Sequence, residues 1–315
     1  MENFILAVNV VLPIALIMLL GSYLKKIKML DDTSVNKMNR LAFRVFMGML
    51  IFINVYNIRN MNLDIKENIR FLLYPITVII FLYIFAYFYY YKKISDRKEF
   101  AVIIQGVYRG NFVLFGLPVA ESIYGDVGIS KVSMLISLIV PIYNVIAVLT
   151  LEYYSGKNIS WKKILKSTIT NPLIVGSLSA ICCIKFGIEL PKPIYKTLFD
   201  LAKIATPLSF VILGASLRIG NIIKNLKKLI SINFMKLIVN PFLTIVCGYY
   251  AGFSGPELVA FLAMSACPTA VSSFTMAKEM NVAGDLAGEI VASTTIFSIF
   301  TIFSWVIVLK SLAWI

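Results

Sequence analysis

Long apolar stretches, separated by short polar connections, account for most of this chain. A helix needs roughly 20 mainly apolar residues to cross a bilayer, and ten stretches meet this requirement. They cover about 4–24, 37–58, 68–91, 99–123, 130–151, 170–188, 197–218, 229–252, 257–281 and 286–310. The connections are too short to hold a soluble domain. The pattern therefore predicts an all-α integral membrane protein with ten transmembrane helices.

Basic residues are distributed unevenly between these connections. The connections after the first, third, fifth and seventh stretches are rich in Lys and Arg, whereas the alternate ones carry few. The rich connections contain Lys25, Lys26, Lys28; Lys92, Lys93, Arg97, Lys98; Lys157, Lys162, Lys163, Lys166; and Lys224, Lys227, Lys228. Because basic loops stay on the cytoplasmic side, we expect a multi-pass cell-membrane protein with both termini outside.

The composition agrees with this prediction. Of the 315 residues, 59% are hydrophobic and 15% are charged, whereas an ordinary soluble domain carries roughly 25% charged residues. The net charge of +14 would suggest nucleic-acid binding in a soluble protein. Here the basic loops account for it, so we expect no nucleic-acid partner. Glu2 precedes the first apolar stretch and Lys25 follows it, which favours a first transmembrane helix over a signal peptide.

Metal or cofactor chemistry has little support in the sequence. The chain has no histidine and four cysteines. All four cysteines lie in apolar stretches without the spacing of metal ligands, at Cys182, Cys183, Cys247 and Cys267. We interpret them as small core residues and expect neither a metal nor a cofactor.

Three pairs of similar positions indicate an internal repeat of five spans, over 1–155 and 169–315. The pairs are Pro13 with Pro172, Leu41-Ala42 with Leu201-Ala202, and Pro118 with Pro268. A repeat with an odd number of spans must be inverted in the membrane. Interrupted helices at matching places of two inverted halves indicate a transporter's binding site.

Pro118 and Pro268 are predicted to break their spans. Proline suits the first position of a helix, so each is expected to begin a second half-helix, with free N–H groups around 119–121 and 269–271. A helix N-terminus carries roughly half a positive charge. Two such ends that converge would bind an anion, above all a carboxylate. The alternative is a simple proline kink packed against neighbouring helices.

The candidate substrate-binding residues gather around these breaks. They are Asn54, Arg109, Gly110, Asn111, Gly116, Pro118, Asn144, Pro268, Thr269 and Ala270. The glycines would let backbones approach closely, and Asn111 would donate to a carboxylate or tie the crossing strands. Arg109 would either bind substrate or pin the crossing through backbone carbonyls. Asn54 and Asn144 are either ligands or interhelical contacts.

Other charges within the apolar stretches have a simpler interpretation. Lys203 and Lys236 lie near predicted span ends, from which their side chains can reach the interface. Glu121, Glu152 and Glu289 also lie near span ends, where we expect water to solvate them.

Five segments resemble the auxin efflux carrier family, which includes plant auxin exporters and bacterial malate or malonate permeases. They are RGNFVLFGLPVAESIYG, NPLIVGSLSA, ATPLSFVILGASL, CPTAVSSFTMAKE and STTIFSIFT. The resemblance implies a ten-span, two-repeat elevator-type carrier, related in fold to bile-acid symporters and sodium/proton antiporters. Spans 1, 2, 6 and 7 would form a scaffold that dimerises, and spans 3–5 and 8–10 a moving transport domain.

The resemblance also implies where substrate binds and which branch of the family is closest. Substrate would sit where spans 4 and 9 cross, with Asn111, Pro118 and Pro268 at crossover positions and Asn144 near a substrate-contacting position. The short connection at 152–169 favours the bacterial branch. The family often has a proline in span 2, where this chain has Phe46-Met47-Gly48-Met49.

The leading hypothesis is a secondary transporter of small organic anions, such as malate- or malonate-type carboxylates or auxin-like acids. Its partners would be that anion, membrane lipid and a second copy of the chain. Transport of an amino acid or a cation is the alternative, although no carboxylate occurs at 109–118 or 263–275. An intramembrane enzyme has less support, because no HExxH motif is present. A channel would not need paired broken helices, and a sensor would usually carry a soluble output domain. No Walker motif is present, which disfavours ATP-driven transport by this chain.

Overall fold

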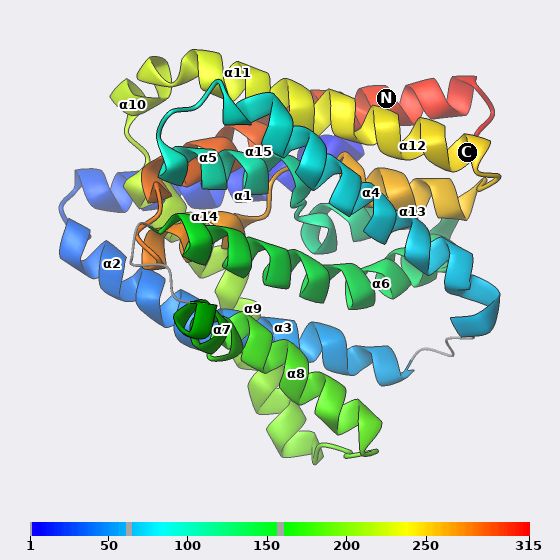
Figure 1. Ribbon diagram of the computed structural model, residues 1–315, viewed down its shortest axis with the longest axis horizontal. Helices are drawn as coiled ribbons and strands as arrows, with labels where there is room; N and C mark the ends of the chain where they lie inside the picture. Colours follow the sequence, from blue (N-terminus) through cyan, green and yellow to red (C-terminus); the bar gives the residue numbers. More distant parts are fainter. Residues whose placement is uncertain (1, 61–64, 156–160) are drawn as a thin grey trace.

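The computed structural model describes residues 2–60, 65–155 and 161–315 (Figure 1). Lys157 therefore lies outside the described residues. The described part consists of helices: α1 Glu2–Lys26, α2 Asp32–Leu41, η1 Ala42–Phe46, α3 Met47–Tyr56, η2 Asn57–Asn60, α4 Ile65–Tyr91, α5 Arg97–Tyr108, α6 Phe112–Tyr154, α7 Trp161–Ile169, α8 Pro172–Lys185, α9 Lys192–Ser216, α10 Ile219–Lys224, α11 Leu226–Phe234, η3 Met235–Val239, α12 Asn240–Tyr250, α13 Pro256–Ser265, α14 Val271–Glu279 and α15 Gly284–Ser311. Within the described ranges, the only isolated β-bridge joins Gly110 to Thr269.

Six helical segments of the described residues are long and apolar enough to cross a membrane. They are Asp32–Tyr56, Asn68–Tyr91, Phe112–Tyr154, Lys192–Ser216, Leu226–Tyr250 and Gly284–Ser311, and two shorter apolar helices are Pro172–Lys185 and Pro256–Ser265. These segments confirm the prediction of an all-α membrane protein. The count of ten spans stays a prediction.

Polar residues in the connections define where several helices begin. Asp31, Asp96 and Asn171 precede α2, α5 and α8, and each side chain accepts a hydrogen bond from a backbone N–H of the first turn, at 2.6, 2.8 and 3.0 Å respectively. Such caps satisfy donors that have no partner inside the helix. Pro172 then occupies the first position of α8, where its missing N–H costs nothing.

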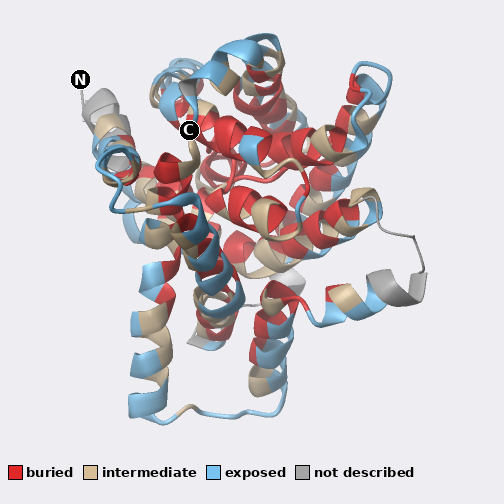
Figure 2. Cartoon of the chain, turned by 90° about the vertical axis from the view of Figure 1, so that its left-hand side faces the viewer, coloured by how far each residue is buried: buried red, intermediate tan, exposed pale blue. Residues whose placement is uncertain are grey.

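The helices pack as two groups. We call α1, α2, η1, α3, η2, α8 and α9 the scaffold group, and α4, α5, α6, α11, η3, α12, α13, α14 and α15 the crossover group. Within the groups, α1 packs on α9, α3 packs on α8 and α9, and α13 packs on α6; between them, α1 packs on α15. Figure 2 shows that buried residues concentrate in the body of the molecule, whereas the projecting ends of α8 and α9 are largely exposed. Whether the two groups move against each other stays a prediction.

Close backbone contacts join the helices of the scaffold group. A Cβ atom added at Gly214 of α9 would lie 1.9 Å from the carbonyl oxygen of Met18 in α1, and one at Gly176 of α8 would lie 2.3 Å from that of Gly48 in α3. Small residues allow helices in a membrane to approach until their backbones touch. These glycines therefore set the spacing of the scaffold group.

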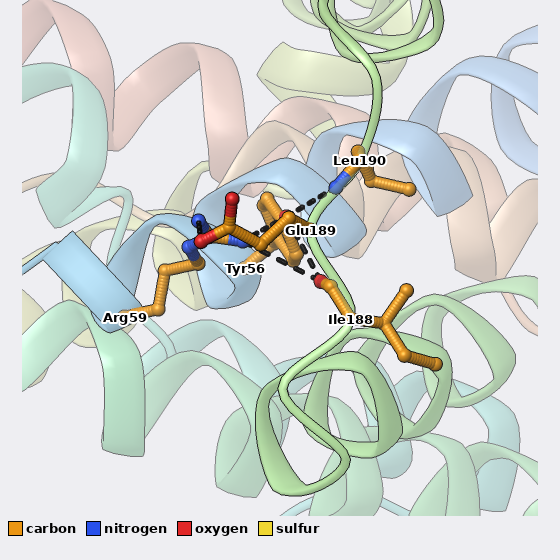
Figure 3. Close-up of polar contacts among 5 residues, drawn as sticks. All are labelled: Tyr56, Arg59, Ile188, Glu189 and Leu190. Carbon is orange, nitrogen blue, oxygen red and sulfur yellow. Dashed lines mark hydrogen bonds and ion pairs between the residues drawn. The ribbon is translucent and has the colours of Figure 1, made fainter.

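The connection between α8 and α9 is tied to the end of α3 (Figure 3). The Tyr56 hydroxyl donates to the Ile188 carbonyl at 3.2 Å and accepts from the Leu190 N–H at 2.9 Å. Arg59 donates to Glu189 at 2.7 Å, and its guanidinium lies 5.1 Å from the Tyr56 ring centre. The polar groups of this connection therefore find partners within the scaffold group.

The helix of span 2 contains a π turn just before the position at which the family often has a proline. The family's proline is replaced by Phe46-Met47-Gly48-Met49, and the helix is π-helical over Ala42–Phe46. A π turn widens a helix without ending it. The segment thus stays one continuous helix from Asp32 to Tyr56.

We predict that Gly214→Ala destabilises the protein, because the added methyl group would overlap a backbone carbonyl that cannot move alone. Overpacking of this kind costs about 1–3 kcal/mol or more. The melting temperature of the detergent-purified protein measures the effect. Gly220→Ala in α10 is the matched control, because nothing lies within 4 Å of a Cβ at that position. Equal melting temperatures for the two variants would contradict the close contact.

Candidate functional site

Two short extended segments cross in the middle of the crossover group. One joins α5 to α6 and the other joins α13 to α14. The Asn111 N–H donates to the Pro268 carbonyl at 2.8 Å, and the Ala270 N–H donates to the Arg109 carbonyl at 3.3 Å. Gly110 and Thr269 pair between these bonds. The backbone polar groups that the two breaks expose are therefore partly satisfied by each other.

The sequence of each segment suits this crossing. A Cβ atom at Gly110 would lie 2.4 Å from Cys267 Sγ and 2.8 Å from the Met264 carbonyl oxygen, so only glycine fits without a shift. The Thr269 hydroxyl donates to the Gly106 carbonyl at 2.7 Å, and the Thr269 N–H donates to Thr294 Oγ1 at 3.1 Å. Pro268 needs no partner for an N–H, because it has none.

The break in the first half does not occur at the predicted position. Pro118 lies inside α6, which begins at Phe112, and so the prediction that it begins a half-helix is wrong. The chain leaves the helix at Arg109 instead, where Gly110 permits the close crossing. In the second half, Pro268 lies in the crossing segment, and the half-helix begins three residues later at Val271.

Four half-helices meet at the crossing through one end each. α5 and α13 end there, at Tyr108 and Ser265, whereas α6 and α14 begin there. The first N–H groups of α6 and α14 have no partner within their own helices, and each helix start carries roughly half a positive charge. The N-termini of two half-helices therefore meet at one place.

A cavity of about 130 Å³ lies at these N-termini, between the two groups of helices. The scaffold group contributes Met47, Leu50, Ile51, Asn54, Leu173 and Thr206, and the crossover group contributes Arg109, Gly110, Asn111, Val113, Leu114, Val140, Tyr143, Asn144, Ala270, Val271 and Ser272. The wall from the scaffold group is mostly apolar, whereas the opposite wall combines apolar residues with Arg109, Asn111, Tyr143, Asn144 and Ser272. None of the lining residues is an Asp or a Glu.

Arg109 is the cation of this cavity. Its side chain is 3% exposed and donates to Asn144 Oδ1 at 2.5 Å, to Ser272 Oγ at 2.8 Å and to Gln105 Oε1 at 3.3 Å. Among the described residues no carboxylate lies within ion-pairing distance of it. Arg109 is thus held by neutral side chains, and not by the backbone carbonyls that the sequence left as an alternative.

Two side-chain amides beside Arg109 lack a hydrogen-bond acceptor. Asn111 Nδ2 and Asn144 Nδ2 are buried and have no partner, although both residues line the cavity. The orientation of the Asn144 amide follows from Arg109, which can only donate and therefore faces the oxygen. A buried donor without an acceptor is unusual. A ligand with acceptor oxygens would satisfy both amides.

The remaining predicted site residues divide into two sets. Asn54, Gly110 and Ala270 line the cavity. Four others do not line it: Gly116, Pro118, Pro268 and Thr269. They support the crossing or the packing around it. A Cβ at Gly116, for example, would lie 3.0 Å from the Ala263 side chain. Sequence reasoning missed Gln105, Tyr143, Thr206 and Ser272. Thr206 and Ser272 lie in segments that resemble the auxin efflux carrier family, and this resemblance could have pointed to them.

Two predictions about charged residues are wrong. Lys236 does not reach the membrane interface: it is fully buried and donates to the Ser265 carbonyl at 3.2 Å. Glu289 is not solvated, because it is 3% exposed and accepts from Asn225 at 2.8 Å. Glu121 and Lys203, in contrast, are exposed, and their contact with water or the membrane interface stays a prediction.

Comparison with known proteins assigns the chain to a family. A family model described as "Membrane transport protein" matches residues 6–306. An uncharacterized transporter of Methanocaldococcus jannaschii is 24% identical over 308 residues, which cover 94% of this chain and 97% of the relative. An uncharacterized transporter of Methanothermobacter thermautotrophicus is 22% identical over 310 residues, covering 97% and 99%. These matches confirm the resemblance seen in the sequence: the chain belongs to the membrane transport protein family, the family of the auxin efflux carriers.

Proposed function

We propose that the protein is a secondary transporter of small organic anions, either malate- or malonate-type carboxylates or auxin-like acids. One observation carries the proposal. The Arg109 guanidinium, two half-helix N-termini and two amides without acceptors meet at one cavity whose lining contains no carboxylate. Each of these groups favours a negatively charged ligand.

The buried charge supports an anion over the alternatives. A buried cation without a counter-ion is costly, and a carboxylate that binds it with several hydrogen bonds offsets that cost. A cationic ligand would add a second positive charge beside Arg109. An amino acid would need an acceptor for its ammonium group, and the lining offers only neutral oxygens for it.

The small volume of the cavity favours a small acid. Its volume of about 130 Å³ is below the roughly 300–1,000 Å³ of pockets that take drug-sized ligands. The carboxylate would face the crossing, and the body of the acid would lie against Met47, Leu50 and Leu173 of the scaffold group.

We further propose the ten-span, two-repeat architecture of an elevator carrier, with both termini outside and a homodimer formed through the scaffold helices. The described helices can be grouped into ten spans if α5 joins the start of α6, and α13 joins α14. Gly125, with φ of 53°, would then separate the fourth span from the fifth. α5 is joined to α6 through one crossing segment, and α13 is joined to α14 through the other. This correspondence supports two inverted halves.

Polar contacts join the two groups at one end of the molecule. Arg44 of η1 donates to Glu279 of α14 at 2.9 Å. Lys278, also of α14, donates to Ser216 Oγ of α9 at 2.6 Å. A transport domain that slides along the scaffold would have to break these contacts and form them again. Ion pairs at a protein surface contribute only about 0–1 kcal/mol, and the Arg44 side chain is exposed, so the Arg44–Glu279 pair is compatible with repeated breaking.

The substrate proposal predicts that acids stabilise the protein. Malate, malonate, succinate, lactate, indole-3-acetate, neutral amino acids and sodium are compared by their effect on its melting temperature, since a ligand of the folded state raises it. We expect a rise with at least one acid. Arg109→Gln should weaken that acid's binding by about 30-fold or more, because loss of a buried charged partner costs about 2–5 kcal/mol.

Two further variants serve as controls for this test. Asn111→Ala should also weaken binding while preserving the fold, because the truncated amide has no protein partner for its N–H groups. Arg218→Gln removes an exposed arginine outside the cavity and should leave affinity unchanged. A rise in melting temperature with sodium or an amino acid, but with no acid, would refute the anion site.

The elevator proposal predicts that a reversible cross-link between the groups stops transport. Arg44→Cys and Glu279→Cys, in a background without the four native cysteines, are joined by a short bis-methanethiosulfonate reagent in proteoliposomes. Uptake of a radiolabelled acid should stop and should return on reduction.

A pair of cysteines within the scaffold group provides the matched control. Tyr195 donates to Asn57 Oδ1 at 3.0 Å, so Asn57→Cys and Tyr195→Cys can be joined by the same reagent. This cross-link should leave uptake intact. Undiminished uptake with the Arg44–Glu279 positions joined would exclude relative movement of the two groups.

A further inference from the structure

Lys236 is a second buried cation beside the crossing, outside the lining of the cavity. It is fully buried in η3, and its ammonium donates to the Ser265 carbonyl at 3.2 Å. Its Nζ lies 3.2 Å from where a Cβ of Gly110 would stand. None of the ion pairs among the described residues includes it. Lys236 is not among the residues that line the cavity.

The partners of Lys236 and its neighbour Asn240 are the C-terminal ends of the half-helices. Ser265 is the last residue of α13. Asn240, one turn after Lys236, donates through Nδ2 to the carbonyl of Val107, in the last turn of α5, at 3.2 Å. The carbonyls at a helix end lack partners within the helix. One segment of the chain therefore caps both half-helices that end at the crossing.

The local backbone of this segment supports a dedicated role. Residues Met235–Val239 form a π turn between α11 and α12, and such turns occur frequently at functional sites. A π turn disturbs the regular pairing of backbone groups. The Leu237 carbonyl accepts from the indole N–H of Trp305 at 3.0 Å, so a partner from α15 supports the altered backbone.

The charges at the crossing balance on one side only. The ends of α5 and α13 each carry roughly half a negative charge, and the starts of α6 and α14 each carry roughly half a positive charge. The Lys236 ammonium offsets the two negative ends. The positive potential of the two helix starts and Arg109 is then left to act on the cavity.

We propose that Lys236 is a built-in counter-cation of the crossing. Its ammonium occupies the carbonyl end of α13, beside the end of α5 that Asn240 caps, in the place that a free monovalent cation would otherwise take. It thereby strengthens the preference of the cavity for anions. This inference rests on the proposed function. Lys236 is a positioning and specificity-determining residue that does not touch the substrate.

The test compares the loss of a charge with the loss of a neutral cap. Lys236→Met removes the ammonium and keeps most of the side-chain volume, whereas Asn240→Leu removes a cap hydrogen bond without changing charge. Malate, malonate and indole-3-acetate are titrated into each purified protein at constant ionic strength. Two opposite charges at roughly 8 Å and an effective dielectric constant of about 20 attract each other enough to change an affinity by about 30-fold. We expect Lys236→Met to weaken acid binding by a factor of this order. Asn240→Leu should weaken it several-fold less.

A second measurement uses the unaltered protein and does not depend on how the variants fold. Acid affinity in sodium chloride should equal that in N-methylglucamine chloride, because the ammonium already occupies the carbonyl end of α13. A requirement for sodium would overturn the inference.

The outcomes separate this inference from the proposed function. If the unaltered protein binds none of the acids, the proposed function fails and the inference fails with it. If it binds an acid and Lys236→Met binds that acid within two-fold as tightly, only the role of Lys236 is overturned. Equal losses in Lys236→Met and Asn240→Leu would assign Lys236 a capping role without an effect of its charge.

Discussion

Backbone polar groups at membrane depth must find partners inside the protein, and the crossing of two extended segments is the solution on which this structure depends. Lipid offers no hydrogen bonds, so each unpaired group there would cost several kcal/mol. The segments around Gly110 and Thr269 pair with each other through two hydrogen bonds. The side chains of Thr269, Thr294 and Asn240 satisfy further backbone groups around the crossing.

The crossing separates the negative ends of the half-helices from the positive ones. Because α5 and α13 end where α6 and α14 begin, negative helix ends gather near Lys236 and Asn240, and positive helix starts gather at the cavity. Arg109 belongs to the second set, held by neutral partners from α5, α6 and α14. The scaffold group closes the cavity with a mostly apolar wall. A charged group and an apolar body are therefore accommodated on opposite sides.

Much of this arrangement could be predicted from the sequence. Hydropathy predicted the all-helical membrane protein, and the unusual polar residues around Arg109 located the crossing and four of the polar or charged cavity residues: Asn54, Arg109, Asn111 and Asn144. The position of the break was wrong, because proline was expected to begin the half-helix. The crossing is at Gly110 instead, because only glycine fits there against Cys267 and the Met264 carbonyl. This contact joins segments far apart in the chain, so it could not be read from the local sequence.

Lys236 shows why the rest could not be predicted. Its distance along the helix from a span end suggested that it reaches the interface, but the packing of η3 against the crossing buries it. Thr206 and Ser272 were missed for a similar reason. Which side of a helix faces a cavity depends on how helices distant in sequence pack together, and an apolar span with few polar positions does not reveal it.

If the cavity attracts anions, a cysteine placed inside it should react faster with anionic than with cationic reagents. Thr206 lines the cavity from α9, so Thr206→Cys is made in a background without the native cysteines. Its rates of reaction with an anionic sulfonate and a cationic trimethylammonium methanethiosulfonate are each divided by that reagent's rate with a small free thiol. We expect a preference for the anionic reagent of roughly ten-fold or more, and a bound acid should slow the reaction. An equal or greater corrected rate for the cationic reagent would contradict it.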